Sequence, residues 1–399
     1  MTQKKKFLIC SVDSFPRMGG VSTLAYEVTR ALGASGHDCV YVGPRGINFG
    51  RRLTNFRVYE DWECDLKLRA GEGADLEDER IFDLLKKISE GYSLDATIAF
   101  HPFYYGLAAV QAAKFLEKPS AVMVHGTELT SQFPTSIDQT VDKHVSDVCS
   151  LPERLRKTIS STDFVLTNSN FTSDIARRIS PDIQTEVIGC GISEKILDHL
   201  EQRTPSYQAK LKSRRRLRIG LSSETLIAYV GRFVAHKNLF QLIDLGAASG
   251  FQVLMMGNGP LRDELETYAN LRGAKVTFDN DADDEKKWQV LEASDFGYLM
   301  STFDSTTGGF EGFGISMLEY CAAGAVCITS GANGMADFAS NEVTTLDIHD
   351  ESGEISVSRL KSFAADEARM NSVIYNARLL IREDYTWESV AKKIVETFQ

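Results

Sequence analysis

Residues 301–337 read STFDSTTGGFEGFGISMLEYCAAGAVCITSGANGMAD, and the centre of this stretch is EGFGISMLE. The apolar residues that follow Gly314 recur at helical spacing, so we expect a helix to begin there. DFGYLM, just before the stretch, and AVCITS, near its end, have the composition of buried strands. The turn therefore falls at the carboxyl end of a strand in an α/β unit, where such folds bind their ligands.

The residues of this turn suit a ligand that carries both phosphate and sugar. Gly312 and Gly314 let backbone N–H groups approach a ligand, and the start of a helix adds unpaired donors and a positive dipole end. Glu311 precedes the turn, and Glu319 lies a little over one turn into the helix. Carboxylates are poor phosphate ligands but good acceptors for hydroxyl groups, which points to a nucleotide sugar. The alternative is a buried turn with two solvated glutamates.

The pattern of Glu, seven residues and Glu in an EGFG context resembles the signature of the retaining glycosyltransferases of family 4. The resemblance covers nearly the whole chain. It implies the GT-B fold, an α/β architecture with two Rossmann-like, doubly wound domains facing a cleft and a C-terminal helix that crosses back to the N-terminal domain. It also implies that the turn binds the donor through Gly312, Phe313, Gly314 and Ile315.

Length and composition restrict the class of protein. The 399 residues, 43% of them hydrophobic, suffice for two domains with ordinary cores. No apolar run approaches the length of a membrane span, and FLICSV near the start is too short for a signal-peptide core. The seven cysteines form no C-x-x-C pair or His/Cys cluster, which is typical of reduced thiols in the cytoplasm. A net charge of −11 opposes binding to nucleic acid.

The chain is expected to consist of two domains and a linker. Residues 1–200 alternate strand and helix signals, and by resemblance they form a Rossmann-like acceptor-binding domain to which the amphipathic segment 386–399 returns. Residues 201–222 are charged and poor in apolar side chains, as in a linker. Residues 223–385 form a second Rossmann-like series, the expected donor-binding domain. The basic cluster at 210–218 is either a solvated surface or a weak peripheral contact with the inner face of a membrane.

Two features of the N-terminal domain bear on function. A predicted strand at 7–12 leads to Gly19 and Gly20 and then to a helical pattern. The third glycine of the G-x-G-x-x-G fingerprint is missing, which disfavours a dinucleotide-dependent oxidoreductase. Gly20 lies where the family has its N-terminal glycine loop. His125 ends the predicted strand SAVMVH, where the family has a histidine that contacts the donor sugar.

The C-terminal domain supplies two cations. The predicted strand 226–230 runs into Arg232, and Lys237 follows just before a helix. A guanidinium and an ammonium five residues apart across such a turn can converge on one anion, although a solvated pair is the ordinary alternative. By resemblance they occupy the positions of the family's diphosphate-binding arginine and lysine. Gly257, in the turn after the next predicted strand, is expected to face the nucleotide.

Three stretches depart from the family's pattern. DNDADDEKK, at 279–287, places five carboxylates near the expected site of the base. FDSTTGGF makes the link from Ser301 to Glu311 longer than usual, and Asp337 stands where a glutamate is usual. The sequence therefore leaves base recognition and the shape of the donor-sugar pocket open.

The resemblance implies a hexosyltransferase-type enzyme that moves a sugar from a nucleoside-diphosphate sugar to a saccharide or lipid-linked glycan with retained configuration, as in bacterial cell-surface polysaccharide synthesis. Arg232 and Lys237 would neutralise the departing diphosphate. Glu311 would hold donor-sugar hydroxyls, Glu319 the ribose and His125 a far hydroxyl of the sugar. No cluster of metal ligands is visible, so no metal or other cofactor is expected. A nucleotide-sugar epimerase, another GT-B enzyme and a non-catalytic nucleotide-sugar-binding protein are the alternatives.

Overall fold

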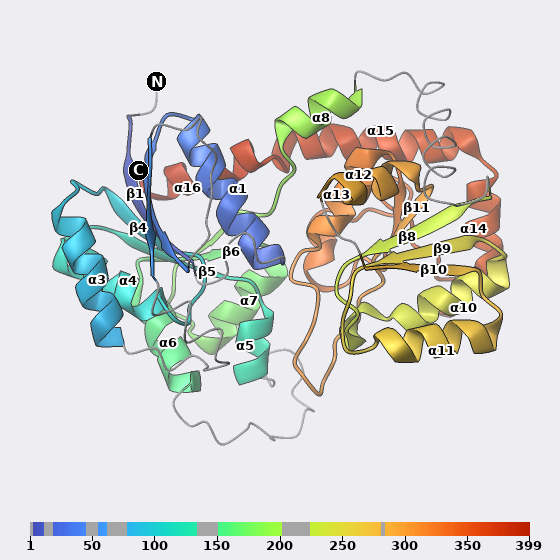
Figure 1. Cartoon of the computed structure of the whole chain (residues 1–399), viewed down its shortest axis with the longest axis horizontal. Helices are drawn as coiled ribbons and strands as arrows, with labels where there is room; N and C mark the ends of the chain where they lie inside the picture. The colour runs from blue at the N-terminus through green and yellow to red at the C-terminus, as the bar shows by residue number, and fades with distance from the viewer. Residues whose placement is uncertain are drawn as a thin grey trace. The chain divides into compact units, whose positions relative to one another are not determined.

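The computed structural model describes residues 3–11, 19–44, 55–61, 78–133, 151–201, 224–280 and 284–399 (Figure 1). The chain forms two compact units. Unit 1 comprises Met1–Cys190 and Trp387–Gln399, and unit 2 comprises Gly191–Thr386. Each unit is built on one parallel sheet with helices around it, so the expected α/β class is confirmed.

Unit 1 contains a seven-stranded sheet with the order β3-β2-β1-β4-β5-β6-β7. Its strands are β1 (Lys6–Cys10), β2 (Asp38–Gly43), β3 (Phe56–Glu60), β4 (Ala96–Ala99), β5 (Ser120–Val124), β6 (Phe164–Thr167) and β7 (Thr185–Val187). The central strands β4 and β5 are buried at every residue, as expected for a parallel sheet covered on both faces. The strand order reverses between β1 and β4, which makes their carboxyl ends the topological switch point where such sheets bind ligands.

The helices of unit 1 connect these strands. Those described are α1 (Gly20–Ala34), α3 (Asp78–Glu90), α4 (Gly106–Phe115), α5 (Thr127–Gln132), α6 (Leu151–Ser161), α7 (Asn170–Ile179) and α16 (Trp387–Thr397). In α1, Leu24, Val28 and Leu32 recur at helical spacing and are buried. This helix begins immediately after Gly19. Like those of any helix start, its first backbone N–H groups have no acceptor within the helix.

The C-terminal helix α16 belongs to unit 1, as the GT-B resemblance implied. It packs against α1, where Arg30 lies 3.7 Å from Glu388 (Figure 1). The Lys5 ammonium donates a hydrogen bond to the carbonyl oxygen of Phe398 at 2.8 Å, next to the first strand. The chain therefore returns to the unit in which it began after completing unit 2.

Unit 2 contains a five-stranded parallel sheet with the order β10-β9-β8-β11-β12. Its strands are β8 (Leu226–Val230), β9 (Gln252–Met256), β10 (Val276–Asp279), β11 (Phe296–Tyr298) and β12 (Val326–Ile328). A parallel bridge between Ile328 and Leu346 extends the sheet beyond β12. The order reverses between β8 and β11, so the switch point of this unit lies where these two neighbouring strands end.

Helices cover both faces of this second sheet. Those described are α8 (Glu194–Glu201), the short 3-10 helix η2 (Ala235–Lys237), α10 (Leu239–Ser249), α11 (Arg262–Arg272), α12 (Asp284–Ala293), α13 (Ile315–Ala323), the 3-10 helix η3 (Asn333–Asp337), α14 (Val357–Ala364) and α15 (Glu367–Asp384). Helices α10 and α11 lie on one face, and α12 and α13 lie on the other (Figure 1). The core between the layers is continuous and includes Ile227, Phe233 and Leu242.

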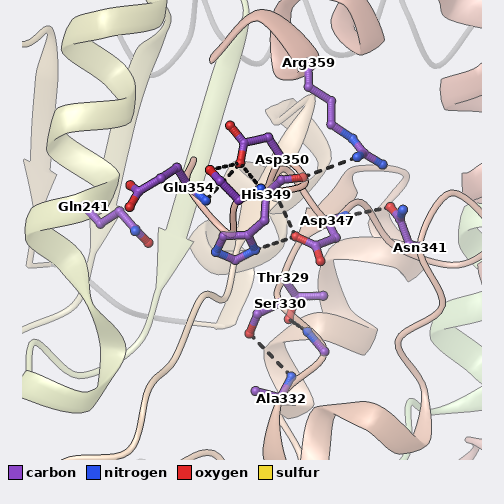
Figure 2. A network of polar contacts seen from close by, with 12 residues as sticks. Gln241, Thr329, Ser330, Ala332, Asn341, Asp347, His349, Asp350, Glu354 and Arg359 are labelled. Atoms are coloured by element: carbon purple, nitrogen blue, oxygen red, sulfur yellow. Dashed lines mark hydrogen bonds and ion pairs between the residues drawn. The ribbon is translucent and has the colours of Figure 1, made fainter. Parts of the chain in front are cut away.

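A polar network around His349 closes the turn between the sheet extension and α14 (Figure 2). Asp347 accepts hydrogen bonds from the backbone N–H and from Nδ1 of His349, at 3.0 and 2.6 Å. Asp350 accepts from the N–H groups of Ser352 and Glu354. These carboxylates thus bond within their own segment, which identifies the network as turn structure.

The boundary of the first unit differs from the expected one at residue 200. The first unit ends at Cys190, and α8 belongs to unit 2 because its contacts lie there. Asp198 of α8 forms an ion pair with Arg382 at 3.0 Å. The N–H of Ile192 donates to the carbonyl oxygen of Tyr385 at 2.9 Å. The expected linker beyond residue 201, with its basic cluster, lies outside the described residues.

None of the helices described is long and apolar enough to cross a membrane. The cysteines that the structure describes are Cys10, Cys39, Cys190, Cys321 and Cys327, and all of them are buried thiols outside any disulfide. Burial raises the pKa of the Cys321 thiol to about 12, so this thiol is protonated and unreactive near neutral pH.

We predict that Ile394→Ala lowers the free energy of unfolding by about 2–5 kcal/mol, because this α16 side chain is fully buried in unit 1. Urea unfolding followed by circular dichroism measures the change. The matched control is Lys392→Ala on the exposed side of the same helix, which should change stability by no more than about 0.5 kcal/mol. Equal effects of the two substitutions would contradict the packing of α16 described above.

Candidate active site

The segments that follow β8 and β11, at the switch point of unit 2, carry charged side chains that form an ion pair. Lys237 follows β8, at the end of η2, and its ammonium forms an ion pair with the carboxylate of Glu311, which follows β11. The two side chains are only 15% and 14% exposed. Ser301, directly beyond β11, donates a second hydrogen bond to Glu311 at 3.2 Å. Two residues predicted separately are therefore direct partners.

Arg232 lies at the same edge but is exposed. Among the residues that the structure describes, no carboxylate lies within ion-pair distance of its guanidinium. Its backbone is fixed, because the Tyr229 hydroxyl donates to the Arg232 carbonyl oxygen at 2.7 Å. Arg232 thus presents a positive charge to solvent from a held backbone.

His236 lies between Arg232 and Lys237 in the sequence, and both charges affect its pKa. Burial, then the charge of Lys237 and more weakly that of Arg232, lower its pKa to about 4 against the opposing effect of Glu311. The imidazole is therefore neutral at physiological pH.

The glycine turn before α13 has the predicted geometry. Gly314 caps the helix with a left-handed φ of 94°, and no side chain caps the N–H groups of the first turn. A Cβ at this position would lie 2.6 Å from Leu299 Cδ2, so glycine is required for both reasons. Phe313 is buried, and its ring lies 5.6 Å from that of Tyr385. Of these neighbours, Phe313 can therefore reach a ligand only through its backbone, whereas Ile315 and Gly312 are partly exposed.

Glu319 has a partner that the sequence did not reveal. Lys287, from α12, forms an ion pair with Glu319 at 2.8 Å, and both side chains are mostly buried. Its neighbour Lys286 pairs with Asp279 at 2.9 Å, at the end of β10. The two lysines close the acidic run DNDADDEKK and offset part of its charge. The signal in the sequence is the pair of lysines that directly follows the five carboxylates.

Gly257 has a structural explanation in addition to its predicted contact with the nucleotide. Its φ is 139°, and a Cβ there would lie 2.0 Å from the carbonyl oxygen of Gly231. The turns after β8 and β9 thus touch backbone to backbone, which requires glycine without any ligand. The predicted contact between Gly257 and the nucleotide stays a prediction.

The unusual FDSTTGGF stretch folds as a compact loop. Asp304 and Gly309 form an antiparallel bridge, and Thr307 donates to the Asp304 carboxylate at 2.6 Å. The N–H of Thr302 donates to the carbonyl oxygen of His236 at 2.8 Å. The loop is thereby attached to η2, the element that carries Lys237.

In unit 1, His125 lies at the carboxyl end of β5, as predicted. Its Nε2 lies 2.8 Å from the carbonyl oxygen of Phe100, which can only accept, so Nε2 carries a proton and donates to it. Its backbone N–H donates to Glu128, and its carbonyl accepts from Asn168 at 3.1 Å. The ring is thus oriented by its neighbours at the strand ends.

His101 was missed by sequence reasoning. It directly follows the short loop beyond β4, and its ring stacks near that of His125, with centroids 6.4 Å apart and an interplanar angle of 22°. Tyr104, in the same HPFYYG turn, has a left-handed φ of 61°. Gly20, the other predicted residue of this unit, is the exposed first residue of α1, whereas residues 12–18 before it lie outside the described part. The order of the strands, which the sequence does not reveal, is what brings His101 to the switch point.

Metal ligands were not expected. Within the part of the chain that the structure describes, no three His, Cys, Asp or Glu side chains gather where they could hold a metal ion. Asp337, which replaces the usual glutamate, ends η3, and its carbonyl oxygen accepts from the Tyr385 hydroxyl at 2.7 Å. Independence from metals stays a prediction.

The fold and the strand ends at the two switch points define a class of protein. Its members have two Rossmann-like units, with charged and glycine-containing turns at the switch points. Residues 18–195 match the family described as Glycosyltransferase Family 4, and residues 213–380 match the family described as Glycosyl transferases group 1. Together the two matches take in most of the chain. The chain belongs to the family 4, group 1 glycosyltransferases of the GT-B type.

A curated relative and several solved structures are similar to the chain. An uncharacterized glycosyltransferase of Methanocaldococcus jannaschii is 23% identical over 200 residues, and the match spans about half of each protein, 49% of both. Sucrose-phosphate synthase from Thermosynechococcus elongatus has a TM-score of 0.74 at 18% identity, covering 99% of this chain and 98% of that one. Anabaena HepE, in complex with UDP and glucose, has a TM-score of 0.70 at 15% identity, covering 98% and 99%. These structural likenesses concern the fold.

We predict that the protein loses stability as the pH is lowered, and that part of this loss comes from protonation of His236. The pKa of this group is about 4 in the folded protein and about 6.5 when unfolded, so the unfolded chain binds the proton more strongly. The stabilisation is complete above about pH 6.5 and is lost as the pH falls toward 4. Urea unfolding at pH 7.5 and at pH 5 should therefore show a larger loss in the wild type than in His236→Gln. The same loss in both proteins would show that His236 is not held neutral.

Proposed function

We propose that this protein is a retaining hexosyltransferase that moves a sugar from a nucleoside-diphosphate sugar to a hydroxyl of a saccharide or glycoconjugate. The observation that carries the proposal is the Lys237–Glu311 ion pair beside the exposed Arg232, at the switch point of unit 2. Cations and a hydroxyl-accepting carboxylate at one strand edge suit a ligand in which a diphosphate joins a sugar.

Similar proteins support the donor class. Structures of Anabaena HepE contain UDP, UDP-glucose, or UDP with glucose. In this chain Arg232 would meet the diphosphate first, because it is exposed and has no carboxylate partner among the described residues. Lys237 would then exchange Glu311 for a phosphate oxygen, and Glu311 would accept hydrogen bonds from hydroxyls of the donor sugar. Glu319, oriented by Lys287, would accept from the ribose.

The chemistry that follows depends on charge at the leaving group. As the bond between sugar and phosphate breaks, negative charge builds on the diphosphate, so a fixed cation stabilises the transition state more than the ground state. The N–H groups at the start of α13 would assist. Retention would follow from attack of the acceptor on the same face as the leaving phosphate, which takes the acceptor's proton. His125 would bind a hydroxyl of the sugar.

The proposed acceptor rests on a structural likeness, and the proposed location rests on the basic cluster. WaaG, a glycosyltransferase involved in lipopolysaccharide biosynthesis, has a TM-score of 0.67 at 13% identity to this chain. A saccharide or lipid-linked glycan of a bacterial cell-surface polysaccharide is the proposed acceptor. We further propose a cytoplasmic enzyme whose basic cluster at 210–218 makes weak contact with the inner face of the membrane. Sedimentation with anionic liposomes at low salt tests this contact, and absence of binding would exclude it.

A thermal-shift panel of UDP, GDP, ADP and their glucose conjugates tests the donor class. A ligand of the folded state raises the melting temperature, and we expect one of the three bases to do so clearly. Arg232→Gln should remove most of this shift, because the exposed guanidinium supplies charge to the diphosphate. Arg369→Gln, which removes a surface ion pair with Glu342, is the matched control and should retain it. A full shift in Arg232→Gln would exclude the assigned role.

The Glu311→Gln variant tests the role of the carboxylate in transfer. Glutamine keeps the size of the side chain but loses the charge that accepts sugar hydroxyls, so kcat should fall on the order of 10²-fold or more. Transfer is measured by release of the nucleoside diphosphate, with Glu342→Gln as control, and the anomeric configuration of the product is read by NMR. Unchanged turnover would remove Glu311 from the mechanism, and an inverted product would exclude retention.

Incubation of the donor without acceptor separates the proposal from its rivals. A transferase should hydrolyse the donor slowly and release sugar and nucleoside diphosphate. Conversion to an epimeric nucleotide sugar would instead identify an epimerase. Tight binding without any turnover, in the presence of a range of saccharides, would indicate a binding protein.

A further inference from the structure

Three tyrosines of unit 2 direct their hydroxyl groups at the backbone of one short segment. This segment, residues 230–238, carries Arg232 and Lys237, and we call it the cation segment. The three side chains come from different elements and are at most 1% exposed: Tyr229, Tyr298 and Tyr320. Each forms a hydrogen bond to a different backbone position of the cation segment.

Tyr320 holds the beginning of the segment. It lies in α13, next to Glu319, and its hydroxyl accepts a hydrogen bond from the N–H of Val230 at 2.8 Å. Pairing between β11 and β8 involves Ile227 and Ala228, so Val230 lies beyond this ladder. The Tyr320 hydroxyl therefore accepts the hydrogen bond of an N–H group that β11 does not pair.

The other two tyrosines hold the middle and the end. Tyr229 donates to the carbonyl oxygen of Arg232 at 2.7 Å. Tyr298 donates to the carbonyl oxygen of Asn238 at 3.0 Å, directly after Lys237, and its hydroxyl is equally close, 3.0 Å, to Oε1 of Gln241 in α10. Asn238 has a left-handed φ of 54°, an uncommon conformation for a residue other than glycine. Buried rings therefore hold the backbone just before Arg232, at Arg232 itself and just after Lys237.

Two glycines make room for these rings. A Cβ at Gly297 of β11 would lie 2.0 Å from Cγ of Tyr320, so that ring passes directly over the glycine. A Cβ at Gly231 would lie 2.8 Å from the hydroxyl oxygen of Tyr229. The sequence thus supplies both the tyrosines and the space that they occupy.

Packing alone does not account for tyrosine at these positions. Phenylalanine would fill almost the same volume, and a buried hydroxyl costs free energy unless it is hydrogen-bonded. Burial also raises the pKa of all three phenols, so they stay protonated at physiological pH. All three hydroxyls serve the same segment, which links the core to the cations.

We propose that Tyr229, Tyr298 and Tyr320 are positioning residues that fix the backbone of the cation segment, so that Arg232 and Lys237 are preorganised for a diphosphate. The inference rests on the proposed function for its purpose, the binding of a nucleoside-diphosphate sugar. The hold on the backbone itself is a property of the free protein and can be measured without any ligand.

The test uses Tyr320→Phe, Tyr298→Phe and Tyr229→Phe in the full chain, with Tyr268→Phe as the matched control. Tyr268 also lies in unit 2, but its hydroxyl donates to Asp244 between α10 and α11, away from the cation segment. Amide hydrogen exchange of peptides from the cation segment is measured first, without ligand. Calorimetric titration then gives the affinity for UDP, GDP and ADP, and steady-state kinetics with the corresponding glucose conjugates give the split between kcat and KM.

We expect faster exchange in the cation segment of the three variants, with exchange elsewhere in unit 2 unchanged. Affinity for the diphosphate and kcat should each fall roughly tenfold, since small displacements of a binding group have effects of this size or larger. The control should match the wild type in all three readouts. If one variant fails to fold, the remaining two decide, because each hydroxyl holds a different position.

Two results would overturn the inference. Unchanged exchange in the cation segment would show that the hydroxyls do not hold it. Faster exchange with wild-type diphosphate affinity and kcat would show that the hold does not position the cations. Failure of the wild type to bind any nucleoside diphosphate would contradict the proposed function and the purpose assigned to the tyrosines, while the exchange data would still decide whether the hold exists.

Discussion

The ion pair between Lys237 and Glu311 is the interaction on which the candidate site of unit 2 depends. It joins the two turns at the switch point of unit 2, one after β8 and one after β11, and Ser301 adds a hydrogen bond to the same carboxylate. Both charges are largely removed from water, which is costly for each alone. In the free protein they offset each other, and a ligand that offers a phosphate to one and a hydroxyl to the other can replace the contact without leaving either charge unpaired.

The surroundings of this pair hold the segment that carries Lys237. Arg232 stays exposed beside it, and His236 is kept neutral by burial and by the neighbouring cations, so the imidazole adds no charge of its own. Thr302, just before the FDSTTGGF loop, hydrogen-bonds to the backbone of His236 and fixes η2 from one side. The buried tyrosines fix the same stretch from the core. The segment that carries Lys237 is thereby held both from the loop side and from the core.

The parts of the site that the sequence predicts are those with a local pattern. EGFG followed by an apolar-periodic helix has a short-range physical cause, and the helix begins directly after Gly314, as expected. Arg232 and Lys237 could be found because they flank one strand-to-helix turn. The pairing of Lys237 with Glu311 spans 74 positions and depends on β8 and β11 being neighbours, which no local pattern specifies.

Other features escaped the sequence for similar reasons. Lys287 became visible as the partner of Glu319 only once α12 and α13 were packed together. Gly257 was assigned to the nucleotide, whereas its nearest constraint is the backbone of Gly231. The unit boundary was placed at residue 200 because charge and composition change there, but α8 packs by its own contacts into unit 2.

The most direct test of the account is a double-mutant cycle on Lys237 and Glu311, with binding of the preferred nucleoside diphosphate measured by calorimetry. Lys237→Gln should weaken binding. Glu311→Gln should tighten binding of the diphosphate, because the carboxylate no longer competes for the ammonium, while binding of the complete nucleotide sugar becomes weaker. The double variant should bind the diphosphate no better than Lys237→Gln, so that the effects are not additive. Strictly additive effects, or no effect of either substitution, would contradict the claim that this ion pair opens to receive the donor.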